Sequence, residues 1–344
     1  MVIKRKRLML VKNNLTLIVT LLLSVLSIFA ALSFGAAPTK LVDVYNSVSG
    51  QWFSSGSDSF LDRIIWQLRL PRTLLAFLAG SGLALAGLIL QTVTRNPLAD
   101  PYLFGISSGA SFGVVCFITF TGISAGFSMS LAAFVGSTLT MILLVLIAGR
   151  KGSGQVETML LAGVALSFLF SAFTSLLLYF SDPQAITAIL FWTLGSFARA
   201  QWHSLWLPAL IILSCIAVLM SFRRQLNAML LGDESAATLG IPVQRFRLLM
   251  LMLSSLITAV LVALCGGIGF VGLMIPHIVR FFVSQGTLTG LAMTALVGGT
   301  FMVWVDVISR IVMSNQELPI GVSTSAIGSV FFLSLLCFRK REYQ

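Results

Sequence analysis

The chain has 344 residues, of which 57% are hydrophobic and 10% are acidic or basic, and its mean hydropathy is +0.99. This composition excludes a water-soluble domain and predicts a protein that crosses a membrane several times. The formal net charge of +11 comes from 22 basic and 11 acidic residues. Because the cations gather at predicted membrane boundaries, the charge reflects topology, and nucleic-acid binding has no support.

The first apolar run follows a basic tail of about residues 1–14. A basic segment before an apolar run is also the pattern of a cleavable secretory signal. This run is as long as a membrane span, whereas a signal core has roughly 7 to 15 residues. We therefore expect a first membrane helix here, followed by an outer loop over about residues 36–62.

Continuous apolar runs predict membrane helices, because a β-barrel would show alternating segments of about ten residues. Glycines interrupt the third run, and Pro276 lies in the short eighth run, so both are expected to be short, kinked or re-entrant. The ten candidate spans are Leu15–Phe34, Thr73–Val93, Tyr102–Thr121, Phe127–Ala148, Thr158–Phe180, Leu205–Phe222, Leu248–Cys265, Ile268–Val283, Leu288–Asp306 and Ile320–Phe338.

Ten spans with a cytoplasmic N-terminus place sixteen of the 22 basic residues inside and six outside. The positive-inside rule therefore predicts an all-α polytopic protein with both termini in the cytoplasm. Spans two to five and seven to ten begin in opposite directions, so they could form an inverted repeat. Small residues in three stretches, GSGLALAG, GISSGASFG and GGIGFVG, would allow close helix packing in lipid.

The longest polar interruption, about residues 223–247, is predicted to lie in the cytoplasm as a short helix with marked ends. Asp233 suits the N-cap and Glu234 the first turn, while Gly240 suits the position after the C-cap and Pro242 prevents continuation. A solvated helical connector remains the alternative to a docking element.

Catalytic motifs and metal-ligand spacings are lacking in the sequence. The four cysteines and two histidines are scattered, and no HExxH, GxSxG or GxxxxGK[ST] pattern occurs. We expect a non-catalytic chain with no metal and no cofactor of its own, so that any ATP is bound by another polypeptide.

Intramembrane charge is a common sign of a transport pathway, and Asp306 is the one acid predicted to lie deep in a span. Arg310 follows one helical turn later, in the favourable order for an ion pair. A neutralised pair is the structural interpretation, whereas an ion-coupled secondary transporter would use Asp306 as its coupling group.

Several long blocks narrow the class. They are RLPRTLLAFLAGSGLALAG, QTVTRNPLADPYLFGISSGASFG, LLGDESAATLGIP, GGIGFVGLMIPHIVRFF, DVISR and ELPIGVSTSAIG. Their order and wording resemble the permease subunits of ATP-driven importers for iron chelates and vitamin B12, the FecCD-type or type II family. The resemblance runs from about Arg69 to Leu336 and implies one transmembrane permease domain over residues 1–344, in a bacterial inner membrane.

The resemblance also implies roles for individual residues. An element that docks on the ATPase would comprise Gly232, Asp233, Glu234, Ala236, Ala237, Leu239 and Gly240. Docking of an external binding protein would use Arg69, Arg72 and Arg310, and the inner mouth of the pathway would be closed by Asn96 and Leu98. Asn96 before a proline breaks a helix and leaves a polar side chain available, although an ordinary turn explains it equally well.

The resemblance implies partners as well. They are a second permease subunit, expected as a homodimer, two ATP-binding subunits that carry ATP and magnesium, an external substrate-binding protein and membrane lipid. The cargo would be a ferric siderophore, haem or cobalamin moved by alternating access. The sequence does not distinguish among these chelates or an oxyanion.

Overall fold

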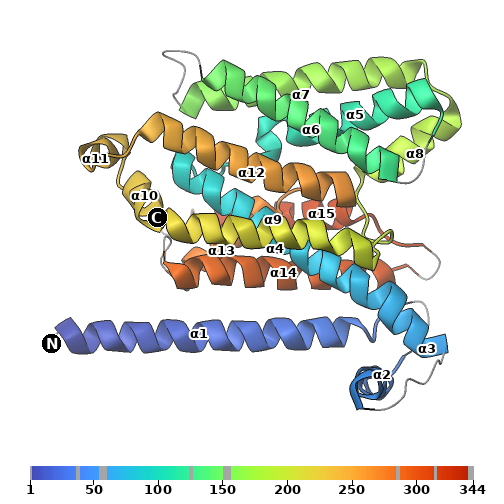
Figure 1. The fold of residues 1–344 in the computed structure, drawn as a ribbon, viewed down its shortest axis with the longest axis horizontal. Helices are drawn as coiled ribbons and strands as arrows, with labels where there is room; N and C mark the ends of the chain where they lie inside the picture. Colours follow the sequence, from blue (N-terminus) through green and yellow to red (C-terminus); the bar gives the residue numbers. More distant parts are fainter. Residues whose placement is uncertain are drawn as a thin grey trace.

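The computed structural model describes residues 2–35, 39–53, 60–123, 127–149, 156–283, 287–313 and 316–339. These residues form a helical bundle, which confirms the all-α class (Figure 1). The elements are α1 (Val2–Ala31), α2 (Leu41–Phe53), α3 (Phe60–Arg63), the π-helix η1 (Ile64–Arg69), α4 (Leu70–Thr94), the 3₁₀ helix η2 (Pro101–Phe104), α5 (Ile106–Thr121), α6 (Phe127–Ala148), α7 (Val156–Tyr179), α8 (Pro183–Thr193), α9 (Trp202–Ser221), α10 (Arg223–Leu230), α11 (Asp233–Thr238), α12 (Val243–Cys265), α13 (Val271–Arg280), α14 (Leu288–Ile311) and α15 (Ile320–Arg339).

The membrane spans agree with the ten predicted runs. Within the described residues, eight helical stretches are long and apolar enough to cross a membrane, and α5 and α13 are shorter apolar helices. These two are the third and eighth predicted spans, where glycines and Pro276 indicated irregularity. α5 begins only after the turn and 3₁₀ helix that precede it, so Tyr102 lies outside the helix proper.

α4 forms the centre of the bundle and packs against α9, α12, α13 and α14. In its most apolar stretch 83% of the residues are buried, compared with 22% in α7 and 17% in α15. α1 lies along one edge of the bundle, against α14 (Figure 1). The apolar faces of α7 and α15 are therefore left for lipid or for another protein chain.

Glycine permits the closest contacts of α4. A Cβ atom on Gly87 would lie 1.9 Å from the carbonyl oxygen of Gly272 on α13, and one on Gly80 would lie 2.1 Å from that of Gly298 on α14. Larger side chains would force these helices apart. The structure thus confirms the close packing expected from the small-residue stretches.

Both chain ends lie at the end of the bundle that carries α10 and α11, and α2, α3 and α8 lie at the opposite end (Figure 1). On the predicted orientation these are the cytoplasmic and outer ends, called the inner and outer ends below. The second member of each proposed four-span unit, α5 or α13, is the short one, which fits the possible inverted repeat. The repeat itself stays a prediction.

Two loops are more helical than expected. The outer loop over about residues 36–62 contains α2 and the beginning of α3, and the inner loop 223–247 contains two helices and the first turn of α12. Apolar length identifies spans but not short amphipathic helices between them. The predicted inner cations Arg150, Lys151, Lys340 and Arg341 lie outside the described residues.

Candidate functional site

The inner end presents a helix–turn–helix element formed by α10 and α11. Gly232 joins the two helices with φ of 118°, and Gly240 ends α11 with φ of 79°. The amide of Gly240 donates to Ala237 O at 2.9 Å and that of Ile241 to Ala236 O at 3.1 Å, which is the Schellman pattern. Positive φ at both ends explains the two glycines and confirms the predicted position of Gly240.

The N-terminal end of α11 differs from the prediction. Gly232 is the N-cap and Asp233 is the first helical residue, so the carboxylate of Asp233 does not cap the helix. Glu234 lies in the first turn, as expected, and is exposed. Two acidic side chains at this end favour the helix through its dipole.

The residues of α11 divide between two faces. Ala236 is fully buried in the hydrophobic core, so it fixes the helix to the bundle and offers nothing to a partner in this conformation. Ala237 is exposed, and Leu239 and Leu231 are 65% and 72% exposed. The exposed apolar side chains in and beside α11 are therefore Ala237, Leu239 and Leu231, and not all the small residues of the helix.

The Asp233 carboxylate instead forms an ion pair that ties α11 to two membrane helices. Both of its oxygens accept hydrogen bonds from Nη2 of Arg247 on α12 at 2.8 Å, and Arg95 lies 3.5 Å away. Nε of Arg247, a side chain that is only 3% exposed, donates to Val93 O at 3.1 Å. Val93 is in the last turn of α4, where carbonyls lack helical partners and a cation is favourable.

The end of α4 leads directly into the predicted gate. Arg95 stops the helix with φ of 52°, and the turn that follows places Leu98 58% exposed at the inner end. The Asn96 side chain supports this turn, because its Oδ1 accepts a hydrogen bond from the amide of Leu98 at 2.9 Å. Leu98 is an exposed apolar side chain of this turn, and the role of Asn96 and Leu98 as an inner gate stays a prediction.

Asp100 closes the same turn. It is buried, and its Oδ1 accepts from the amide of Tyr102 at 2.8 Å as the N-cap of η2. Burial raises the pKa of Asp100 to about 6, partly offset by this hydrogen bond. The turn of residues 95–100 is thus held by backbone-directed bonds at both of its ends.

A second polar link joins α4 to α13. Nε2 of Gln91 donates to Gly272 O at 3.0 Å, and Arg280 donates to Oε1 of Gln91. The amide thus uses both its donor and its acceptor inside the bundle. Together with Arg247, it makes the inner half of α4 the meeting point of α11, α12 and α13.

Four charged side chains of the described residues form a network at the outer end. Asp306 on α14 is fully buried and lies 2.7 Å from Arg310 and 2.8 Å from Arg72 of α4. Arg72 also binds Glu317, with contacts of 2.6 and 2.9 Å to the two carboxylate oxygens. The predicted Asp306–Arg310 pair is confirmed, and Arg72 joins it from a helix more than two hundred residues earlier in the chain.

Arg69 is bonded to a different segment from Arg72. It is 6% exposed, and its Nη1 donates to Leu32 O at 2.7 Å and to the hydroxyl of Thr39. These bonds fix the segment after α1 against the beginning of α4. In this conformation Arg69 offers almost no surface to a docking protein, and the docking role of the three arginines stays a prediction.

Sequence reasoning missed Arg247, Glu317 and Gln91. Arg247 was recognised only as a basic residue at a membrane boundary, and Glu317 as part of a family motif. The available signal was an arginine directly before the apolar run that begins at Leu248, since a cation at the end of a membrane helix needs an acceptor or water. Its acceptors on α4 and α11 could not be identified from local spacing.

The bundle, with its helices long and apolar enough to cross a membrane, defines a multi-pass membrane protein. The chain belongs to the FecCD transport family, which it matches over residues 21–338. It is an ABC importer permease of this type, and membership implies an ATPase and a binding protein as partners.

Individual relatives agree with this assignment. The chain is 38% identical over 289 residues to the vitamin B12 import system permease protein BtuC of Klebsiella pneumoniae, covering 83% of this chain and 85% of that protein. It is 38% identical over 297 residues to the hemin transport system permease protein HmuU of Yersinia pestis, covering 85% and 87%. A solved metal-chelate type ABC transporter in an inward-facing conformation has a TM-score of 0.80 and 33% identity, covering 94% and 99%.

Proposed function

We propose that this permease moves a metal chelate into the cytoplasm by alternating access, driven by ATPase subunits that dock on α10 and α11. Relatives named for vitamin B12 and hemin, and a solved structure of metal-chelate type, support this cargo class. Ferric siderophores belong to the same class. The exposed apolar side chains Ala237, Leu239 and Leu231 are the proposed docking surface.

The Asp233–Arg247–Val93 connection is the single observation that carries this proposal. Movement of α11 reaches α4 through two hydrogen-bonded contacts of 2.8 and 3.1 Å, without passing through a flexible loop. The next residues after α4 form the turn that presents Leu98. A docked ATPase can therefore move the predicted gate by shifting α11, because packed and hydrogen-bonded elements transmit displacement.

The proposed pathway runs along the face shared by α5, α7 and α8. A cavity of about 340 Å³ lies there, in a region otherwise covered by apolar side chains. Hydroxyl groups facing lipid would be costly, so this polar hollow fits a hydrated path. Its hydroxyl-bearing residues are Ser107, Ser108, Ser111, Ser171, Thr174, Ser175 and Thr193.

A second copy of the chain would complete the pathway on this side. α7 exposes large apolar residues, including Phe168 at 73% and Leu161 at 71%. Such a face supports burial against a partner helix in a homodimer. The external binding protein would approach the outer end, where a docking carboxylate would exchange with Glu317 for Arg72.

An ion-coupled carrier based on Asp306 is the weaker alternative. Its carboxylate is already shared by Arg72 and Arg310, so a coupling cation would have to displace one of them. Uptake that continues without ATP hydrolysis but stops when the proton gradient is removed would favour this alternative.

The docking assignment is tested with Ala237→Arg and Leu239→Arg in the complex reconstituted with its ATPase. Each change places a bulky charge at an exposed position in or directly after α11, and we expect loss of ATPase association and of uptake. Leu288→Arg is the matched control, because Leu288 is 46% exposed at the inner end of α14. Normal association and uptake in both α11 variants would show that the ATPase docks elsewhere.

A further inference from the structure

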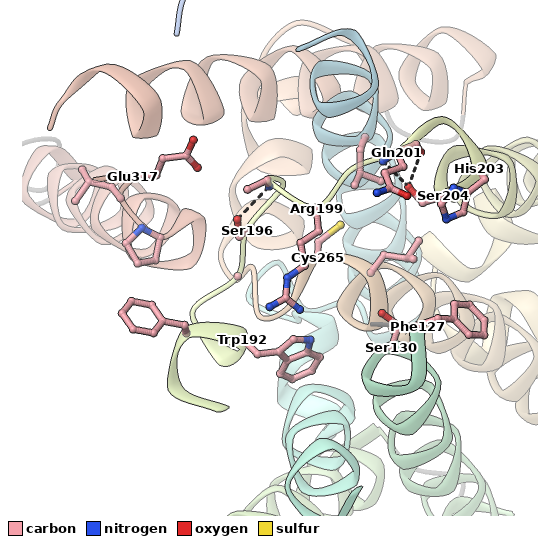
Figure 2. Close-up of a pocket in the computed structure, with 17 residues that line it drawn as sticks. Phe127, Ser130, Trp192, Ser196, Arg199, Gln201, His203, Ser204, Cys265 and Glu317 are labelled. Carbon is pink, nitrogen blue, oxygen red and sulfur yellow. Dashed lines mark hydrogen bonds between the residues drawn. The ribbon is translucent and has the colours of Figure 1, made fainter. Parts of the chain in front are cut away.

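A cavity of about 670 Å³ lies at the outer end of the bundle, apart from the hydroxyl-lined hollow (Figure 2). It is bordered by the outer ends of α4, α6 and α12, by the connection from α8 to α9, and by the segment before α15. Its volume is within the roughly 300–1,000 Å³ typical of small-molecule sites. The position is where a cargo released at the outer surface would first meet the permease.

The wall of this cavity is built from three backbone segments joined by hydrogen bonds. Ser196 N donates to Cys265 O at 2.8 Å, and the amides of Ile320 and Gly321 donate to Gly195 O and Leu194 O at 3.1 and 2.9 Å. Gly195 has φ of 76°, and a Cβ atom there would lie 2.6 Å from Gly267 O. Such tight packing holds the lining in a fixed shape, as a pre-formed site requires.

The charge of the cavity is positive. Arg199 is exposed to it, and within the described residues Arg199 has no ion-pair partner. The acidic residue in the lining, Glu317, is neutralised by Arg72 at 2.6 Å. In Figure 2 the guanidinium of Arg199 points towards Trp192, and Glu317 lies on the other side of the cavity.

The remaining polar and aromatic groups suit an anionic, partly planar ligand. Trp192 is half-buried in the lining, and Ser130, Gln201 and His203 also border the cavity. A guanidinium binds carboxylate or catecholate oxygens through two parallel N–H groups, and an indole ring stacks on planar surfaces. Neutral ligands of the same size would gain only the stacking.

We propose that this cavity is an outer receiving site for the cargo, and that Arg199 makes it selective for chelates with negatively charged oxygens. The inference rests on the proposed transport function and deepens it by assigning the charge of the preferred cargo. Arg199 binds the anionic groups, and Trp192 contacts the planar part of the chelate.

The test compares two ferric chelates that differ in charge, a trianionic tricatecholate and an uncharged trihydroxamate. Equilibrium dialysis with radioactive iron measures their binding to the full chain in nanodiscs, without ATPase or binding protein. We expect Arg199→Gln to weaken tricatecholate binding by about tenfold and to change trihydroxamate binding by less than about twofold, as loss of a charge-assisted hydrogen bond predicts. Arg199→Lys should recover part of the affinity.

Lys40→Gln is the matched control, because Lys40 is an exposed cation of the outer end that does not line the cavity. Three results would each overturn the assignment. Arg199→Gln could weaken the binding of both chelates equally, Lys40→Gln could weaken tricatecholate binding as much as Arg199→Gln does, or the wild type could fail to bind the tricatecholate. Binding-protein association is measured separately on the same nanodiscs. If Arg199→Gln weakens that association and leaves tricatecholate binding unchanged, Arg199 is a docking residue and the assignment is overturned.

Uptake by the complete reconstituted complex separates this inference from the proposed function. Chelate selectivity in dialysis without any ATP-driven uptake would refute the transport proposal and leave the receiving site supported. ATP-driven uptake that is equal for both chelates and unchanged in Arg199→Gln would support the transport proposal and refute the selectivity assigned to Arg199.

Discussion

Replacing Asp233 by asparagine should disconnect the docking element from α4 while leaving the ATPase bound. The amide side chain would keep one acceptor for Arg247 but lose the charge that pairs with a guanidinium side chain only 3% exposed. Breaking a buried pair costs about 3–5 kcal/mol and an exposed pair about 0.2–1 kcal/mol. Because Asp233 is 40% exposed, we expect about 1–2 kcal/mol, a five- to thirtyfold change in an equilibrium.

The assay measures three quantities on the reconstituted complex: ATPase association, ATP hydrolysis and uptake. Asp233→Asn should leave association within about twofold and reduce uptake per ATP hydrolysed, whereas Leu239→Arg should abolish association. Glu234→Gln is the control, since Glu234 is the neighbouring exposed carboxylate of the same turn. Loss of association in Asp233→Asn, or equal uncoupling in Glu234→Gln, would refute transmission through Arg247.

Three further predictions concern stability, measured by thermal unfolding in detergent. Gly87→Ala should destabilise by about 1–3 kcal/mol, because its Cβ would lie 1.9 Å from a backbone oxygen. Gly50→Ala, inside α2, meets nothing within 4 Å and should stabilise by up to about 1 kcal/mol, because alanine is the better helix former. The pKa of Asp100 is about 6 in the folded protein, above its ordinary value of 3.8, so the folded state binds this proton more tightly than the unfolded state. Stability should therefore fall as the pH rises from about 4 to 6. Asp100→Asn should remove this pH dependence and increase stability at pH 7. Asp306→Asn should cost about 3–5 kcal/mol, because the buried Arg310 loses its carboxylate partner and Arg72 keeps only Glu317. Glu317→Gln, at a side chain that is 46% exposed, should cost less than about 1 kcal/mol. The ion-pair argument is contradicted if Glu317→Gln destabilises more than Asp306→Asn. The titration argument fails if Asp100→Asn keeps the pH profile of the wild type, and the packing argument fails if the two glycine variants unfold at equal midpoints.

The family resemblance implied the docking element, and the sequence showed its helix end. Gly240 has the positive φ that the pattern indicated, yet Ala236 faces the core and Ala237 faces outward. Residues one apart on a helix point in different directions, so a run of small residues predicts a helix without stating which of them a partner can reach.

The outer arginines show the same division. The Asp306–Arg310 pair could be predicted because an i, i+4 spacing brings two side chains together on any helix. The partner of Arg72 could not, since Glu317 is 245 residues away and reaches it only when α4 and α14 are packed side by side. Arg69 and Arg72 stand in one motif, but one is buried against the segment after α1 and the other joins the ion network.

The sequence by itself determined the class of this protein, the ten spans, their short third and eighth members, and the paired charge of α14. These features depend on hydropathy and on contacts within about one helical turn, and both are determined by residues that are close together in the sequence. Only the tertiary structure decided that Arg247 joins α11 to α4. It also decided that Arg199 lines a cavity whose acidic residue, Glu317, is already paired with Arg72. Such pairings depend on how helices distant in sequence are placed against one another, and that placement results from the packing of the whole bundle.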